Sequence, residues 1–232
     1  MDRTMDERRR RALVWLGGAG ALILDGRASA QGKAPLPACV VTPQQTEGPY
    51  FVDNRLQRAD IRAEPGGAAR PGVPLALSLR VMNVSANACA PLAGAMVDIW
   101  HCDAQGAYSG VDGGRTAFLR GYQVSDAEGR VRFMTIYPGW YPGRAVHIHF
   151  KVRGSASPGA AAGRGFEFTS QWYFDEALNE RVLAAGAYVR SGARVRNERD
   201  GSFRSGGERL MLSAAQSGQG YAATFDIGVR TA

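Results

Sequence analysis

The fold is decided by the stretch Tyr137-Pro-Gly-Trp-Tyr-Pro-Gly-Arg-Ala-Val-His-Ile-His-Phe150, which holds two of the 3 histidines of the chain. Successive side chains of a β-strand point to opposite faces, so His147 and His149 share one face while Ile148 and Phe150 enter a core. Two imidazoles at this spacing suit a metal ion. The pattern also fits the polar face of an antiparallel strand, and the rest of the chain has to decide between these two interpretations.

Short alternating apolar runs, separated by turn residues, predict that the chain is all-β. The 30 glycines and 11 prolines favour many turns over long helices. About seven short strands predict a single β-sandwich, with long loops that build a site at one end. The expected elements are strands at 75–82, 95–100, 147–150, 171–174 and 222–229, a hairpin of 121–125 with 131–136 across the turn 126–129, and one helix at 175–185.

The chain divides into three segments. Residues 1–30 predict a removable export signal: the arginines at 8–11 precede an apolar run at 12–24, and Ala28-Ser-Ala30 fits a cleavage site. The arginine pair ahead of the apolar run resembles a twin-arginine signal, which sends folded proteins to the periplasm or the extracellular space. The alternative is a short membrane anchor. Residues 31–72 are expected to form an irregular N-terminal strap, and residues 73–232 the β-sandwich catalytic domain.

The charge pattern and the cysteines narrow the partners and the compartment. The formal net charge is +7, but the arginines are scattered, so nucleic acid is not an expected partner. We also expect no stable membrane span after processing. An exported protein with 3 cysteines can keep one disulfide, and we expect it between Cys39 and Cys89, which leaves Cys102 as a thiol.

A loop tyrosine completes a candidate metal site. Asp103 and Gly106 suit a turn that displays Tyr108 on a loop at a sheet end, although such a phenol often only contacts water. A phenol has a reference pKa near 10, so it binds weakly acidic divalent ions poorly at neutral pH. A trivalent cation removes the phenolic proton on binding. Two phenols, Tyr108 and Tyr141, with His147 and His149 therefore favour Fe(III) over Fe(II) or Zn(II).

Four motifs in order resemble those of the intradiol ring-cleavage dioxygenases, the non-haem iron(III) enzymes that include protocatechuate and catechol dioxygenases. They are Thr46-Glu-Gly-Pro-Tyr50, Ile99-Trp100 with Gly106-Ala-Tyr-Ser109, Tyr141-Pro-Gly-Arg144 with His147-Ile-His-Phe150, and Gln171-Trp-Tyr-Phe174. The resemblance runs from Thr42 to Val229 and points to an exported subgroup.

The resemblance implies an activity and a set of site residues. Members of the family insert both atoms of O2 into a catechol-type aromatic and release a muconic acid derivative. The implied Fe(3+) ligands are Tyr108, Tyr141, His147 and His149. Arg144 matches an arginine that stabilises negative charge on the ring, and Gln171 a glutamine that bonds near it. The implied substrate-binding residues are Gly48, Pro49, Tyr50 and Trp100.

Other features leave alternatives open. The interval between Tyr141 and His147 is short, and Gly143 stands where the protocatechuate subfamily has tryptophan, so the preferred catechol is not determined. A homodimer is one open arrangement. His101 is expected to be structural. The competing functions are a secreted β-sandwich metal-binding module without turnover and a transthyretin-like scaffold.

The N-terminal segment yields a first testable prediction. Replacing Arg10 and Arg11 by lysine should block export and leave folded protein in the cytoplasm, because the twin-arginine route requires the arginine pair itself. Fractionation of cells that express the full chain measures this. Unimpaired export of the variant would show that another route, or another arginine pair, is used.

Overall fold

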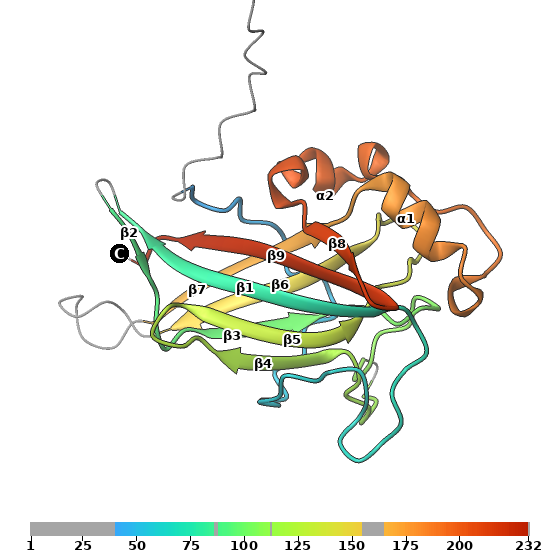
Figure 1. Cartoon of the computed structure of the whole chain (residues 1–232), viewed down its shortest axis with the longest axis horizontal. Helices are drawn as coiled ribbons and strands as arrows, with labels where there is room; N and C mark the ends of the chain where they lie inside the picture. The colour runs from blue at the N-terminus through green and yellow to red at the C-terminus, as the bar shows by residue number, and fades with distance from the viewer. Residues whose placement is uncertain (1–39, 86–87, 112, 155–164, 232) are drawn as a thin grey trace, which may run out of the picture. The chain divides into compact units, whose positions relative to one another are not determined.

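The computed structural model describes residues 40–85, 88–111, 113–154 and 165–231, and within these ranges two β-sheets pack face to face (Figure 1). One sheet holds β1 (Pro74–Val84), β2 (Cys89–Pro91), β5 (Arg130–Ile136), β8 (Ser213–Ser217) and β9 (Gly220–Val229). The other runs in the order β4 (Arg120–Val124), β3 (Met96–Trp100), β6 (His147–Gly154) and β7 (Phe166–Tyr173). The prediction of an all-β sandwich is therefore confirmed.

The core lies between the sheets. The predicted inward face of β1, formed by Leu75, Leu77, Leu79 and Val81, is at most 2% exposed. Ile148 and Phe150 of β6 lie in the same cluster, as the alternation around the histidines predicts. β6 lies between β3 and β7 in its sheet, and its side chains from His147 to Val152 are buried on both faces, including the polar ones.

The predicted hairpin of β4 and β5 is wrong. The turn forms, with Gly129 N donating to Asp126 O at 2.9 Å, but β4 pairs with β3 in one sheet and β5 pairs with β1 in the other. Turn residues reverse the chain without choosing a partner strand. Val131 and Phe133 instead face Leu79 and Leu77 of β1 in register.

The predicted helix is confirmed as α1 (Glu176–Leu183), which Asp175 caps by accepting from the backbone N–H groups of Ala177 and Leu178. After α1 the chain forms a second short helix, α2 (Gly201–Arg204). Three 3-10 turns lie around it: η1 (Gly186–Tyr188) and η2 (Asn197–Arg199) before it, and η3 (Gly207–Leu210) after it. In Figure 1 both helices lie near the end of the sandwich where β6 begins and β7 ends.

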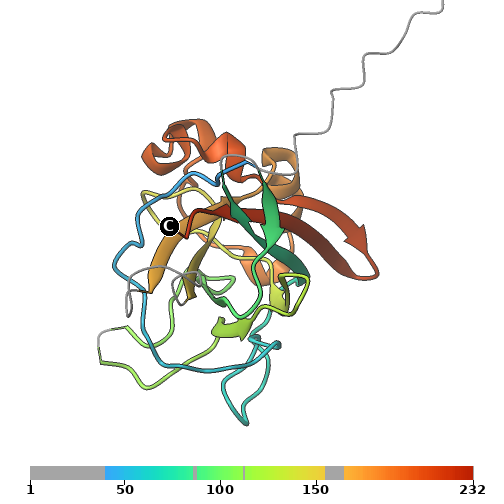
Figure 2. The ribbon, with the colours of Figure 1, turned by 90° about the vertical axis from the view of Figure 1, so that its left-hand side faces the viewer.

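The described part of the N-terminal strap, residues 40–72, bonds to strands of both sheets (Figure 2). It bonds first to β9 and β7, through Thr42 N to Gly228 O at 2.9 Å and Gln45 N to Thr169 O at 3.0 Å. It then reaches β5, where Ile61 N donates to Met134 O at 3.0 Å. Ion pairs add to this, since Glu47 contacts Lys151 and Asp53 lies 3.0 Å from Arg153.

Some expectations fall on other parts of the chain. The export signal, residues 31–39 of the strap and Cys39 lie outside the described residues. Cys89 is disulfide-bonded, and Cys102 is a free, buried thiol. Within the described ranges, no helix is long and apolar enough to span a membrane.

Two loops at the β6 end of the sandwich interlock through glycines. Gly139, between β5 and β6, lies so close to the β3–β4 loop that an added Cβ would stand 2.5 Å from the carbonyl oxygens of Asp103 and Ala104. Gly106, on the β3–β4 loop, has φ +84°, and its Cβ would stand 2.4 Å from Trp140 O. The two loops therefore touch backbone to backbone, which holds Tyr108 and Tyr141 at a set separation.

This close contact can be tested with Gly106→Ala. The control is Gly94→Ala, because Gly94 also has a positive φ, +75°, but nothing within 4 Å of an added Cβ. The control should lose about 1–2 kcal/mol of unfolding free energy from the left-handed backbone alone. Gly106→Ala should lose about 1–3 kcal/mol more, the usual effect of overpacking. Equal losses in urea unfolding would show that the loops do not constrain each other.

Candidate active site

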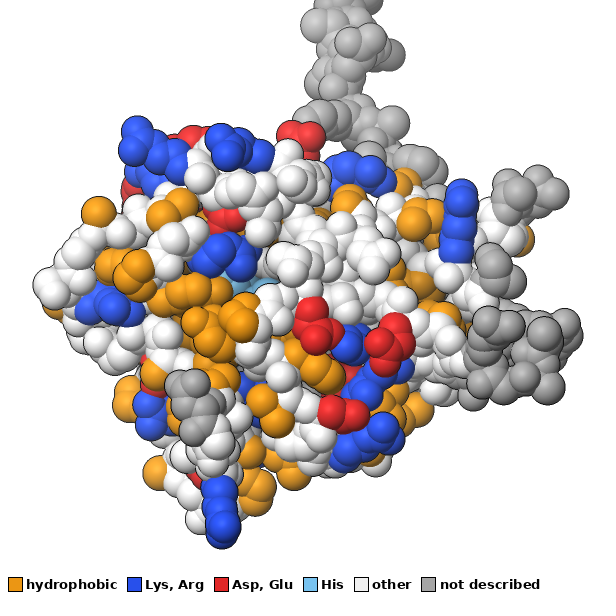
Figure 3. All heavy atoms as spheres, turned by 180° about the vertical axis from the view of Figure 1, so that it is seen from behind, with side chains coloured by type: hydrophobic (Ala, Val, Ile, Leu, Met, Phe, Trp, Pro, Cys, Tyr) orange, Lys and Arg blue, Asp and Glu red, His pale blue; other side chains and the backbone are white. Residues whose placement is uncertain are grey.

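The structure brings together the two phenols and two imidazoles that the sequence singles out. Tyr108 Oη and Tyr141 Oη each lie 3.3 Å from His147 Nε2, and His149 Nε2 lies 3.0 Å from the same atom. The phenols come from the two interlocked loops, and the histidines are the first and third residues of β6. On the face seen in Figure 3, histidine atoms lie at the bottom of a hollow rimmed by hydrophobic and basic side chains.

Both imidazoles are neutral and present a ring nitrogen to this cluster. They are 1–2% exposed, and burial lowers the pKa of His147 to about 3 and that of His149 well below its usual value. His147 Nδ1 lies 2.6 Å from Ala145 O, which only accepts, so Nδ1 carries the hydrogen and Nε2 the lone pair. His149 Nδ1 is buried without a hydrogen-bond partner in the described part of the chain.

Both phenols are uncharged in the absence of a cation. Loss of water around the hydroxyl groups raises the pKa of Tyr108 well above 10 and that of Tyr141 to about 12. Four polar groups thus meet with no positive charge among them. The donor set fits a highly charged cation, since such an ion stabilises the phenolate form that the dry surroundings disfavour.

The strap and β3 supply the walls around the cluster. Tyr50 stacks on Tyr108, with ring centroids 4.4 Å apart, and meets the Tyr141 ring edge-on at 5.9 Å. Gly48 lies against His149, because its Cβ would stand 3.4 Å from Cε1 of that ring. Trp100 is 1% exposed and stacks on His149 at 5.0 Å, so its contact with the site runs through that imidazole. Pro49 is exposed on the strap.

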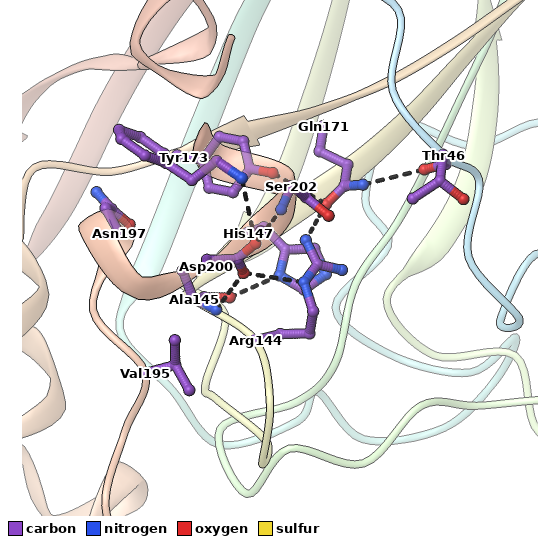
Figure 4. Close-up of polar contacts among 12 residues, drawn as sticks. Thr46, Arg144, Ala145, His147, Gln171, Tyr173, Val195, Asn197, Asp200 and Ser202 are labelled. Carbon is purple, nitrogen blue, oxygen red and sulfur yellow. Dashed lines mark hydrogen bonds and ion pairs between the residues drawn. The ribbon is translucent and has the colours of Figure 1, made fainter. Parts of the chain in front are cut away.

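Arg144 stands beside the cluster in a network of side chains (Figure 4). Its Nη2 donates to Gln171 Oε1 at 2.5 Å, and its Nε donates to Asp200 Oδ2 at 2.9 Å. Gln171 is fully buried, and its Nε2 donates to the strap at Thr46 O, 3.0 Å away. The glutamine that the resemblance implies near this arginine thus bonds to it directly.

The third histidine lies outside the cluster. Its Nδ1 is 2.8 Å from Cys102 O and its Nε2 is 2.6 Å from Thr135 Oγ1, so both nitrogens of His101 are occupied by the protein. Burial lowers the pKa of His101 to about 4, which keeps it neutral. This arrangement agrees with the structural role expected for it.

Sequence reasoning missed two charged residues that hold the site together. Asp200 is the buried carboxylate that pairs with Arg144, 56 positions away. The run Asp200-Gly-Ser predicts a helix cap, but no local signal indicates that the second carboxylate oxygen faces the site.

Arg120 is the other missed residue, and it is a buried cation that bonds to neutral oxygens. It is 2% exposed, and it donates to Ser109 Oγ at 2.9 Å, to Ser109 O and to Tyr50 O at 3.2 Å. Burial lowers its pKa to about 10. Arg120 therefore ties the strap to the loop that carries Tyr108.

Comparisons of the sequence agree with this geometry. A family model described as dioxygenase matches residues 46–177, which is more than half of the chain. Chlorocatechol 1,2-dioxygenase of Pseudomonas putida is 34% identical over 104 residues, which covers 36% of this chain and 36% of the relative. Catechol 1,2-dioxygenase 2 of Acinetobacter lwoffii is 32% identical over 130 residues, 48% of this chain and 46% of the relative. The chain thus spans less than half the length of these curated relatives.

Two solved structures match over nearly their whole length. An intradiol ring-cleavage dioxygenase from Tetranychus urticae is 31% identical with a TM-score of 0.69, covering 83% of this chain and 96% of that one. The dioxygenase domain of a carbohydrate-binding fusion protein from Streptomyces sp. SirexAA-E is 32% identical with a TM-score of 0.62, covering 83% of this chain and 100% of that one. By sequence and by fold, this chain belongs to the intradiol ring-cleavage dioxygenase family.

Proposed function

We propose that the chain is an Fe(III)-dependent intradiol dioxygenase that inserts both atoms of O2 into a catechol-type aromatic and releases a muconic acid derivative. The relatives described above support the reaction class. The observation that carries the proposal is the meeting of two phenols and a second neutral imidazole within 3.3 Å of His147 Nε2.

The charge of the donor set supports Fe(III). Tyr108, Tyr141, His147 and His149 would hold the ion, with two phenolates and two neutral imidazoles contributing two negative charges. The raised pKa values of the phenols mean that a weakly acidic divalent ion gains little from them. Bound Fe(III) supplies a Lewis acid that favours the deprotonated catechol and makes its ring reactive toward O2.

Arg144 is the residue that we propose to stabilise negative charge on the substrate ring. Its guanidinium is held at Nε and Nη2 by Asp200 and Gln171, so its direction is set before substrate arrives. A preorganised positive group in a dry pocket stabilises developing charge without the cost of reorienting water. The side chain of Arg144 remains 20% exposed, which leaves part of it accessible.

The strap forms the proposed substrate wall. Gly48 brings its backbone against His149, and a side chain there would narrow the space beside this imidazole. Tyr50 covers Tyr108 and reduces the access of water to the phenols. Pro49 lies exposed beside them, and Trp100, which is buried behind His149, would support the substrate wall through its stacking on that ring.

The cellular setting is a further part of the proposal. The arginine-led apolar segment before Ala28-Ser-Ala30 supports export, and the catechol would then be met outside the cytoplasm. Small catecholic aromatics and O2 are the proposed partners, and a homodimer is a compatible assembly.

A metal-binding module without turnover accounts for less of the geometry. Metal storage needs the four donors, but it gives no task to a guanidinium fixed by Asp200 and Gln171 beside them. Buried ion pairs of this kind cost desolvation, and sites of catalysis are where such groups concentrate.

The ligand set is tested by removing one phenol and one imidazole. Tyr108→Phe and His147→Ala should each lose most of the bound iron and the visible colour, because phenolate-to-iron(III) charge transfer requires both the phenolate and the ion. Metal analysis and absorption spectra of purified full-length protein measure this.

The matched control is Tyr122→Phe, which removes a phenolic hydroxyl from the strap side of β4, where it lies 3.5 Å from Gln57 Oε1. It should keep iron and colour. Full iron content and an unchanged spectrum in both Tyr108→Phe and His147→Ala would remove these residues from the proposed ligand set.

The role of Arg144 is tested by Arg144→Lys. Lysine keeps the charge but lacks the planar fork that bonds Asp200 and Gln171 together. Iron and colour should remain, whereas turnover of catechol should fall about a hundred- to a thousandfold, or ~3–4 kcal/mol, as for one lost preorganised contact. Steady-state rates and catechol-induced spectral shifts are the measurements.

Arg80→Lys serves as its control. Arg80 and Asp226 form an exposed ion pair between β1 and β9, in the sheet that does not contain β6. The control should leave rate and spectrum unchanged. Near-normal turnover in Arg144→Lys would refute the role proposed for this arginine, and loss of iron would assign it to support of the metal site.

A further inference from the structure

Asp200 has a buried carboxylate, and its two oxygens bond to different partners: one to the start of α2 and the other to Arg144 and Ala145. Oδ1 accepts from the backbone N–H groups of Ser202 and Phe203, at 2.7 and 3.1 Å, and so caps α2. Oδ2 accepts from Ala145 N at 2.6 Å and from Arg144 Nε at 2.9 Å (Figure 4). The carboxylate side chain is 0% exposed, and the bond from Ala145 N is fully buried, whereas the other three bonds are partly buried.

A second aspartate in the chain shows what capping alone requires. Asp175 caps α1 with Oδ1 in the same way, accepting from Ala177 N at 3.0 Å and Leu178 N at 3.1 Å. No bond from an arginine to Asp175 occurs among the interactions of the described residues. Capping therefore accounts for Oδ1 of Asp200 but not for the burial of a second oxygen against Arg144.

The bond from Arg144 Nε to Asp200 fixes the plane of the guanidinium, which the bond from Nη2 to Gln171 does not fix by itself. A long arginine side chain held only at Nη2 can rotate about that point, because one bond fixes a position and not a plane. Gln171 on β7 and Asp200 before α2 hold two different nitrogens, and two anchored atoms together with the Cδ end define the guanidinium plane. The bond from Ala145 N to the same Oδ2 also fixes the backbone next to Arg144.

Electrostatics favour the ionised pair. Burial alone opposes the carboxylate form, yet the hydrogen bond from Ala145 N and the charge of Arg144 lower the pKa of Asp200 below its ordinary value. If the pair breaks, the fully buried carboxylate of Asp200 loses its partner charge, which opposes separation of Asp200 from Arg144.

We propose that Asp200 is a positioning residue that sets the direction of the Arg144 guanidinium toward the catecholic substrate, so that the 197–204 segment becomes part of the active site. This inference rests on the proposed function for its effect on turnover, but not for its effect on Arg144 itself. The side chain of Asp200 bonds to Arg144, to Ala145 and to the start of α2, and we propose that it acts through Arg144.

The test is Asp200→Asn in the full-length, iron-loaded protein, compared with Asp175→Asn. Asparagine caps helices as well as aspartate does, so both variants keep an oxygen for the cap. At position 200 it puts an NH2 group against two donors, Arg144 Nε–H and Ala145 N–H. We expect Asp200→Asn to retain iron and colour but to lose about ten- to a hundredfold in kcat, as for a small misplacement in an active site. Asp175→Asn should keep the wild-type kcat.

A double-variant cycle separates positioning from general support of the fold. If Asp200 acts through Arg144, then Arg144→Lys with Asp200→Asn should be no slower than Arg144→Lys alone. Additive losses, or a wild-type kcat in Asp200→Asn, would overturn the inference. Asp200→Ser, which also caps but cannot reach Arg144, gives the same comparison where the asparagine variant folds poorly.

A measurement without turnover distinguishes this inference from the proposed function. With diamagnetic Ga(III) in place of iron, the Arg144 Nε–H resonance, assigned by its loss in Arg144→Lys, should exchange slowly with water. It should exchange fast in Asp200→Asn and remain slow in Asp175→Asn. Equal exchange in all three proteins would overturn the inference. A wild-type protein that cleaves no catechol would refute the proposed function, while the exchange rates would still decide whether Asp200 fixes Arg144.

Discussion

The structure depends on the burial of His147 and His149 side by side on one face of a central strand. Neutral imidazoles at 1–2% exposure, with Nε2 atoms 3.0 Å apart, hardly reach bulk solvent, so a partner from the protein or a bound ion stabilises them. Tyr108 and Tyr141, from two loops, place their hydroxyl groups 3.3 Å from His147 Nε2. The two phenols and two imidazoles are uncharged without a metal ion, and a bound cation would stabilise all four as ligands.

Holding four such groups in place requires rigid neighbours rather than flexible loops. The glycine contacts at Gly106 and Gly139 lock the two phenol-bearing loops backbone to backbone. Arg120 bonds the strap and the Tyr108 loop at once, and Trp100 supports the ring of His149. Because of these contacts, close packing with neighbouring residues restricts the side-chain rotamers of the two phenols and two imidazoles.

Arg144, beside the cluster, is also held in place by neighbouring side chains. Arg144 stands just before β6, yet its direction depends on Gln171 from β7 and Asp200 from the C-terminal segment. Segments far apart in sequence thus converge on one guanidinium. The C-terminal segment after β7 therefore bonds, through Asp200, to the arginine beside the candidate site.

Local periodicity was enough to predict the all-β class, the pairing of His147 and His149 on one face, the inward residues of β1, and the helix after Asp175. The set of Tyr108, Tyr141 and Arg144 with these histidines followed from motif order and family resemblance. The β4–β5 hairpin was predicted wrongly, because turn residues specify a reversal while the packing of Val131 and Phe133 against β1 chose the partner. The sequence by itself determined which residues alternate, turn and cap. Only the tertiary structure decided that Asp200 meets Arg144 and that Arg120 joins the strap to a loop, because contacts across 56 and 70 positions arise from the packing of whole sheets and leave no local pattern.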